Sequence, residues 1–106
     1  MNIVFKDQLL IDLYDGTRTY HNQFRSNPGI IKKFRSALVI IQNIEKLSQL
    51  FNYPGLHYEK LKGNLNMYSS IRLNKKYRLI FREVHNNLDF GIVDTLEITE
   101  ISNHYS

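Results

Sequence analysis

Positive charge is concentrated in one segment of the chain, between residues 60 and 82. This segment carries seven basic residues and no Asp or Glu. Its basic residues are Lys60, Lys62, Arg72, Lys75, Lys76, Arg78 and Arg82. The formal net charge of the whole chain is +4, so subtracting the +7 of this segment leaves −3 for all other residues. A compact basic surface of this kind is typical of a protein that binds a polyanion, most often a nucleic acid.

Two arginines of this segment are expected to face each other across a β-hairpin. Side chains alternate between the two faces of a strand, so Ile71 and Leu79 pair on one apolar face if the hairpin loop is residues 74–76. This register places Arg72 opposite Arg78 on the other face. Like charges at opposed positions destabilise a sheet unless an anion lies between or above them. A phosphate would satisfy both arginines, because each planar guanidinium donates two parallel hydrogen bonds to phosphate oxygens.

Ion pairing and simple solvation are alternatives to a phosphate site for these cations. Ion pairs with Glu59, Glu97 or Glu100 would also neutralise the two arginines, and a single surface lysine more often belongs to a solvated face than to a site. Lys62, in the loop before the hairpin, would add a mobile point charge to a bound phosphate. Around this centre, we expect RNA to be contacted by Lys60, Lys75, Lys76, Arg82 and Tyr68.

Histidine is the candidate for proton transfer. The four histidines, at positions 21, 57, 85 and 104, have no metal-ligand spacing, and the chain contains no cysteine. With no glycine-rich phosphate loop either, we expect neither a metal site nor a nucleotide cofactor. His104 follows a predicted strand, where its imidazole could act as a general acid or base beside the cations. A frayed surface histidine is the alternative.

Length and composition predict a single soluble domain. A chain of 106 residues can bury one core, so we expect one domain over residues 1–106. The absence of cysteine suits a reducing cytosol. No signal-peptide pattern is visible, and the longest apolar run, residues 37–41, is far shorter than the roughly 20 residues that span a bilayer. We therefore expect a cytoplasmic protein without membrane contact.

The first part of the sequence has the pattern of a strand followed by a helix. Residues 2–5 are β-favouring and predict a short strand. Asp7 is a typical helix cap, and apolar residues then recur at helical spacing until Asp15-Gly16 stops them. Residues 17–26 show no clear period, so we expect a polar loop there.

The rest of the sequence predicts two further helices and a β-meander. Asn27-Pro28 has the pattern of a cap followed by proline at the first helical position. The helical period continues past a bend near Asn43, as a second helix that Pro54-Gly55 ends. Three predicted strands cover residues 68–73, 77–83 and 92–101. Helices segregated from a mostly antiparallel sheet indicate a small α+β fold.

The order of several short motifs resembles the HigB branch of the RelE/ParE toxin superfamily. The N-terminal half contributes Val4-Phe5-Lys6-Asp7, Leu13-Tyr14 and the helix beginning at Pro28. The basic segment and the C-terminus contribute Leu61-Lys62-Gly63, Ser70-Ile71-Arg72, Tyr77-Arg78-Leu79-Ile80-Phe81 and Ile101-Ser102-Asn103-His104-Tyr105. Each motif is weak alone, but their order and spacing cover nearly the whole chain.

The resemblance implies a RelE-like fold and a toxin of a type II toxin–antitoxin system. Such a toxin is a ribosome-dependent mRNA endoribonuclease, in which the 2′-OH of the RNA attacks the adjacent phosphate without a metal. Carried over by position, Lys62, Arg72 and Arg78 would hold the phosphate, and His104 would move a proton. The implied partners are a small helix-turn-helix antitoxin of HigA type, the ribosome with its rRNA, and mRNA.

The chain departs from the family pattern near the implied site. Many such toxins have a histidine where this chain has Glu59, and His57 lies two residues too early to be equivalent. Glu59 is therefore an alternative base. The C-terminal Ser102-Asn103-His104 lacks an acidic neighbour for the histidine. Two other functions remain open: a ParE-like inhibitor of DNA gyrase without RNA cleavage, and a non-catalytic nucleic-acid-binding module.

Overall fold

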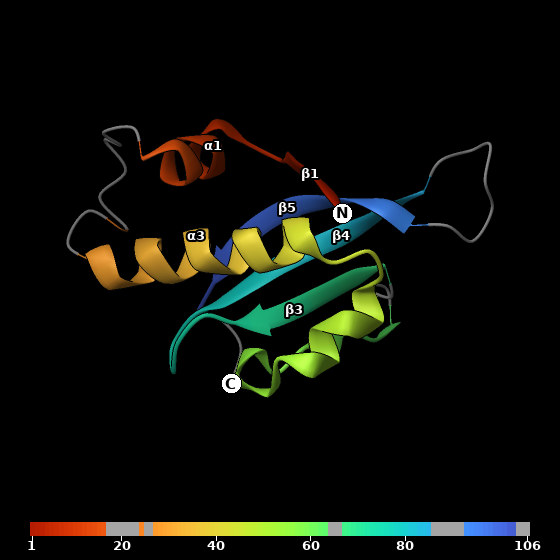
Figure 1. The fold of residues 1–106 in the computed structure, drawn as a ribbon. Coiled ribbons are helices and arrows are strands. Elements are labelled where there is room, and N and C mark those ends of the chain that lie inside the picture. The colour runs from red at the N-terminus through yellow and green to blue at the C-terminus, as the bar shows by residue number, and fades with distance from the viewer. Residues whose placement is uncertain (17–23, 25–26, 64–66, 86–92, 104–106) are drawn as a thin grey trace.

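The computed structural model describes residues 1–16, 24, 27–63, 67–85 and 93–103. They form a five-stranded sheet in the order β1-β5-β4-β3-β2, with helices packed on it (Figure 1). The elements are β1 (Asn2–Phe5), α1 (Gln8–Asp15), α3 (Pro28–Asn43), the 3₁₀ helices η1 (Leu47–Asn52) and η2 (Pro54–Leu56), β2 (Glu59–Lys60), β3 (Tyr68–Arg72), β4 (Arg78–His85) and β5 (Val93–Ser102). This arrangement confirms the predicted α+β class. Within the described ranges, no helix is long and apolar enough to cross a membrane.

The sheet is antiparallel except at one edge. Strands β3, β4 and β5 form the predicted meander. Strand β1 lies parallel to β5, with Asn2 opposite Thr95 and Phe5 opposite Ile98. The two-residue strand β2, which the sequence did not indicate, forms the other edge by pairing with β3. The basic hairpin β3–β4 therefore lies between β5 and the short strand β2.

Both predicted helix starts are confirmed by their caps. The Asp7 carboxylate accepts a hydrogen bond from the Leu10 backbone N–H at 3.2 Å. The Asn27 side-chain oxygen accepts one from the Ile30 N–H at 3.3 Å. Helix α1 stops at Gly16, whose φ of 74° lies in the left-handed region that glycine adopts without steric cost. Local capping chemistry thus fixes where α1 and α3 begin and where α1 ends.

The second helix predicted after Asn43 is wrong in type. Helix α3 ends at Asn43, where the following backbone becomes extended, and the 3₁₀ helices η1 and η2 occupy the next segment. The Gln49 side-chain oxygen accepts hydrogen bonds from the Glu45 and Lys46 backbone N–H groups at 2.6 and 2.9 Å, which holds a tight turn at the start of η1. Leu50 is still fully buried. The apolar spacing therefore pointed correctly to the burial of Leu50, whereas Phe51 is 67% exposed and the helix type differs.

The core lies between the helices and one face of the sheet. Its fully buried side chains include Phe34, Leu38 and Ile41 of α3 and Ile71, Leu79, Phe81, Leu96 and Ile98 of the sheet. Phe24 also belongs to this core, and its ring packs against Tyr77 with centroids 5.8 Å apart. The polar-loop prediction for residues 17–26 is wrong at Phe24, which is helical and buried. The other residues of that stretch lie outside the described part of the chain.

Truncation of Phe34 tests the packing of α3 on the sheet. Phe34→Ala removes a fully buried ring and is expected to lower the free energy of unfolding by about 3–5 kcal/mol. Val39 on the same helix is 52% exposed, so Val39→Ala should change it by about 0.5 kcal/mol or less. Urea denaturation of both variants measures the difference. Equal losses would show that α3 does not use this face to pack.

Candidate functional site

The register predicted for the basic hairpin is confirmed. Arg72 of β3 lies directly opposite Arg78 of β4. The Asn74 side chain shapes the turn between them, because its oxygen accepts hydrogen bonds from the backbone N–H groups of Lys76 at 2.9 Å and Tyr77 at 2.7 Å. Asparagine commonly closes turns in this way. The strand alternation and the turn residue Asn74, both visible in the sequence, thus place the two arginines opposite each other.

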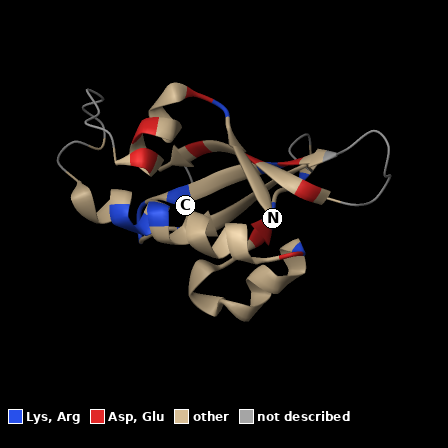
Figure 2. Ribbon diagram, turned by 45° about the horizontal axis from the view of Figure 1, so that its top comes forward, with Lys and Arg blue, Asp and Glu red and all other residues tan. Residues whose placement is uncertain are grey.

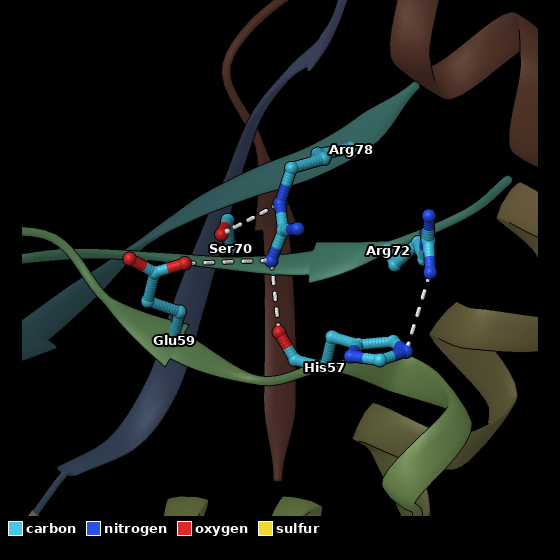
Figure 3. A network of polar contacts seen from close by, with 5 residues as sticks. All are labelled: His57, Glu59, Ser70, Arg72 and Arg78. Atoms are coloured by element: carbon cyan, nitrogen blue, oxygen red, sulfur yellow. Dashed lines mark hydrogen bonds and ion pairs between the residues drawn. The ribbon is translucent and has the colours of Figure 1, made fainter. Parts of the chain in front are cut away.

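Arg78 extends across β3 to the segment that precedes and begins β2 (Figure 3). Its Nε donates a hydrogen bond to the Ser70 Oγ at 3.1 Å, and its Nη2 donates one to the His57 carbonyl oxygen at 2.8 Å. The same Nη2 lies 3.9 Å from a carboxylate oxygen of Glu59. The Arg78 side chain is only 18% exposed. Arg78 therefore ties β4 to a segment two strands away, besides carrying charge.

Arg72 reaches the same segment through a different atom. Its Nη1 lies 3.3 Å from the Nε2 of the His57 ring. Both guanidinium groups therefore contact His57, one through the ring and one through the carbonyl oxygen (Figure 3). Each arginine has found an acceptor, which relieves the repulsion expected for opposed like charges. The ion pair with Glu59 that the sequence left open is present for Arg78.

A left-handed backbone places His57 between the arginines. Its φ of 46° is positive, which among the other described residues is true only of Gly16 and Gly63. The His57 N–H donates to the Pro54 carbonyl oxygen at 3.2 Å and so closes η2. A residue with a side chain adopts this conformation at some cost, which its surroundings must offset. The sequence pattern gave His57 no role, because it lies two residues before the family position. The tight turn at Pro54 was the local signal that could have pointed to it.

Carboxylates engage two of the cations predicted to contact RNA. The Lys60 Nζ lies 3.7 Å from Glu83, and the Arg82 guanidinium lies 3.3 Å from Glu97. The pKa of Arg82 is raised above its ordinary value, because the hydrogen bond with the Glu97 side chain and the charge of that carboxylate both favour the protonated form. Lys60 and Arg82 thus have partners within the sheet, and their contact with RNA stays a prediction.

The remaining predicted residues lie in the hairpin turn, beside or at the start of β3, or beyond the described residues. Lys75 and Lys76 are exposed in the hairpin turn, and the Lys76 Nζ lies 5.5 Å from the centre of the Tyr77 ring. Lys62 is exposed in the segment between β2 and β3. Tyr68 is half-buried opposite Arg82. His104 lies outside the described residues, so its predicted role is not tested by this geometry.

Positive charge continues from the hairpin to α3. A groove of about 360 Å³ between α3 and the η1–η2 segment reaches β3 and is lined in part by Lys33, Ala37, Tyr53, Leu56 and Arg72. Figure 2 shows basic positions on α3, with acidic positions on the neighbouring helix α1. An anionic chain bound at Arg72 can therefore meet a further cation and apolar walls on the side of α3.

Known structures share this fold. A YoeB/ParE toxin from Agrobacterium tumefaciens superposes with a TM-score of 0.57 at 18% identity, covering 99% of this chain and 100% of that chain. A chain of a YoeB-YefM complex from Staphylococcus aureus also gives a TM-score of 0.57, at 24% identity, covering 99% of this chain and 98% of that chain. The structure therefore has the fold of the RelE/ParE class of small toxins.

Sequence comparison defines the family within this class. The family model for the RelE-like toxin of type II toxin–antitoxin system HigB matches residues 3–96. The chain is 38% identical over 86 residues to Toxin HigB-1 of Vibrio cholerae serotype O1, which covers 79% of this chain and 85% of that protein. It is 33% identical over 85 residues to an uncharacterized protein of Haemophilus influenzae, covering 80% and 81% of the two chains. The chain belongs to the HigB-like toxin family, and its partner is the antitoxin of a type II system.

The two arginines should differ in their effect on stability. Arg78→Ala removes hydrogen bonds from a largely buried guanidinium and is expected to lower the free energy of unfolding by about 1.5–3 kcal/mol. Arg72→Ala removes one longer contact at the surface and should cost about 1 kcal/mol or less. Lys75→Ala, in the exposed turn, is the matched control. Urea denaturation distinguishes them, and equal losses for Arg72 and Arg78 would contradict the bonding described.

Proposed function

We propose that this toxin is an endoribonuclease that cuts mRNA on the ribosome without a bound metal. The observation that carries the proposal is the convergence of Arg72 and Arg78 on one exposed segment, His57 to Glu59, in a chain of the HigB-like toxin family. Guanidinium groups presented from adjacent strands suit the oxygens of one phosphate. Inhibition of DNA gyrase involves no proton transfer, so it would not require two arginines beside the His57 imidazole and the Glu59 carboxylate.

In the proposed reaction, the RNA supplies its own nucleophile. The 2′-OH attacks the adjacent phosphorus, and negative charge grows on the phosphate oxygens as the bond to the 5′-oxygen breaks. Donors fixed in advance at the position of that charge lower the barrier. We assign this role to Arg72, Arg78 and Lys62. His104 is proposed to move a proton, and Glu59, beside Arg78, is the alternative base.

Arg72 is the arginine best suited to meet an incoming phosphate. Its contact is with an exposed imidazole at 3.3 Å, whereas Arg78 is held by Ser70 and by the His57 carbonyl oxygen at shorter distances. Arg72 can therefore exchange its one contact for a phosphate oxygen with less disturbance of the structure than Arg78 can. Arg78 would act from a fixed position, as a donor already oriented by the fold.

The remaining cations are proposed to dock the toxin on rRNA. Lys75 and Lys76 project at the hairpin turn, and Lys33 borders the groove next to Arg72. Lys60, Arg82 and Tyr68 would add contacts along the sheet. We further propose that the antitoxin is a HigA-like helix-turn-helix protein, and that the toxin acts in the cytoplasm, where translating ribosomes are found.

Cleavage should depend on the ribosome and leave products of 2′-OH attack. Translating mRNA is expected to be cut efficiently and naked mRNA weakly or not at all, because the described surface offers a small cationic site without an extended platform for bases. The products should carry 2′,3′-cyclic phosphate and 5′-hydroxyl ends. Primer extension and end-group analysis of both RNAs measure these outcomes.

A 2′-deoxy nucleotide before the cut site is the control, and it should abolish cleavage of ribosome-bound message. Equal cutting of free and ribosome-bound RNA would refute ribosome dependence, and 5′-phosphate products would refute attack by the 2′-OH. Intact mRNA with trapped gyrase–DNA complexes would favour the gyrase inhibitor, and intact mRNA with ribosome binding alone would favour a non-catalytic module.

Arg72 should affect catalysis more than binding. Arg72→Ala is expected to lower the single-turnover cleavage rate by about a hundredfold or more, the scale for loss of one oriented donor, with nearly unchanged ribosome affinity. Arg72→Lys should recover little, because a point charge cannot replace the planar fork. Lys75→Ala is the control, and should change binding by about 1 kcal/mol or less, mainly through its salt dependence. Loss of binding with a parental rate at saturation would assign Arg72 to docking instead.

A further inference from the structure

His57 is the residue on which both site arginines converge. Its ring nitrogen Nε2 lies 3.3 Å from the Arg72 Nη1, and its carbonyl oxygen accepts a hydrogen bond from Arg78 at 2.8 Å (Figure 3). The residue is exposed, so its ring is accessible to a substrate. We infer that His57 is a catalytic residue, the general base that takes the proton from the attacking 2′-OH. This inference rests on the proposed function and adds a role that the family motif does not give to this position.

The contact with Arg72 fixes which ring nitrogen is the base. A guanidinium group has donors and no acceptor, so the Nε2 of His57 must accept the hydrogen bond from Arg72. The ring proton is then on Nδ1, and the Nε2 lone pair points toward the Arg72 guanidinium. A base needs such a lone pair directed at the place where the substrate binds. The structure therefore presents the imidazole in the tautomer that proton abstraction requires.

Phosphate binding would release this lone pair at the reacting group. When Arg72 turns its donors to a phosphate, at about 2.7–2.9 Å for charge-assisted bonds, Nε2 loses its partner and lies next to the bound phosphate. The 2′-OH that attacks belongs to the ribose attached to that same phosphate, so it is brought within reach of Nε2. Arg72 thus protects the lone pair in the free toxin and exposes it when substrate arrives.

The proton and electron pairs balance in one displacement. The 2′-O–H proton moves to Nε2 of His57, and the 2′-oxygen forms a bond to phosphorus as the bond from phosphorus to the 5′-oxygen breaks. The leaving 5′-oxygen takes a proton from water. The products are a 2′,3′-cyclic phosphate and a 5′-hydroxyl, and His57 then returns its proton to solvent. The carboxylate of Glu59, by contrast, lies 3.9 Å from the Arg78 Nη2 and pairs with that arginine.

The backbone and the ring of His57 have separate roles: the carbonyl oxygen holds Arg78, and the ring is the proposed base. The left-handed backbone, with φ 46°, and the N–H bond to Pro54 direct the carbonyl oxygen toward Arg78. Glycine adopts this conformation freely, and asparagine tolerates it better than most residues. His57→Gly and His57→Asn therefore keep the carbonyl contact with Arg78 while removing the imidazole. Ordinary thermal melting should show both variants folded like the parent.

Single-turnover cleavage of ribosome-bound mRNA tests the assignment. We expect the rate to fall by about 10²–10⁴-fold in His57→Gly and His57→Asn, with ribosome binding retained. Imidazole added to the buffer should restore the His57→Gly rate by tenfold or more, and should leave the parent and His57→Asn unchanged. A substrate with a 5′-sulfur leaving group, which needs no acid, should not restore the rate of His57→Gly.

Each alternative result overturns the inference in a defined way. If His57→Gly cleaves at the parental rate, the His57 ring takes no part in the reaction and the inference is wrong. The proposed function would still stand, because the parent toxin would still cleave mRNA. A lowered rate that imidazole does not restore would make His57 a positioning residue for Arg72. Restoration of His57→Gly by the 5′-sulfur substrate would make it the acid. No cleavage by the parent would instead overturn the proposed function.

Discussion

The register of the β3–β4 hairpin fixes the core and the cation pair together. Ile71 and Leu79 lie opposite each other and are fully buried, so hydrophobic burial holds the two strands in one alignment. A shift by one residue would move these side chains to the polar face and turn the arginines toward the core. The opposition of Arg72 and Arg78 is therefore a consequence of packing, and acceptors before and within β2 reduce the repulsion that it creates.

Features encoded by neighbouring residues were predictable from the sequence, and features that depend on distant contacts were not. The caps at Asp7 and Asn27, the meander and the arginine register all follow from local signals, and the structure confirms them. The burial of Phe24 depends on a contact with Tyr77, and the place of β1 depends on β5. His57 was set aside in the sequence because it lies two residues before the family position, and its contacts with the arginines depend on a single left-handed residue, which has no periodic pattern. Lys62 and His104 were candidates that the resemblance favoured, and their roles stay predictions.

Charge density along the sequence overstates the cationic surface of the sheet. The basic segment contains no acidic residue, yet Glu83 follows it directly, and Glu97, 15 residues beyond Arg82, lies on the neighbouring strand. Lys60 of β2 reaches across β3 to Glu83 of β4, and pairing of β4 with β5 brings Glu97 beside Arg82, which a count along the chain cannot reveal. Lys60 and Arg82 are thereby paired with carboxylates, whereas Lys75 and Lys76 at the hairpin turn are exposed. Exposed positive charge is therefore found at the hairpin turn, and Lys33 and Arg72 line the groove beside α3.

The parallel pairing of β1 with β5 also has a consequence for synthesis. Asn2 lies opposite Thr95, so β1 must wait for β5, which is made after the other described strands, before the sheet can close. Pairing between segments so far apart in sequence slows folding, and a nascent chain that lacks β5 has the arginines without the sheet that orients them. A ribosome translating this message would therefore carry a chain without the closed sheet until β5 had been made.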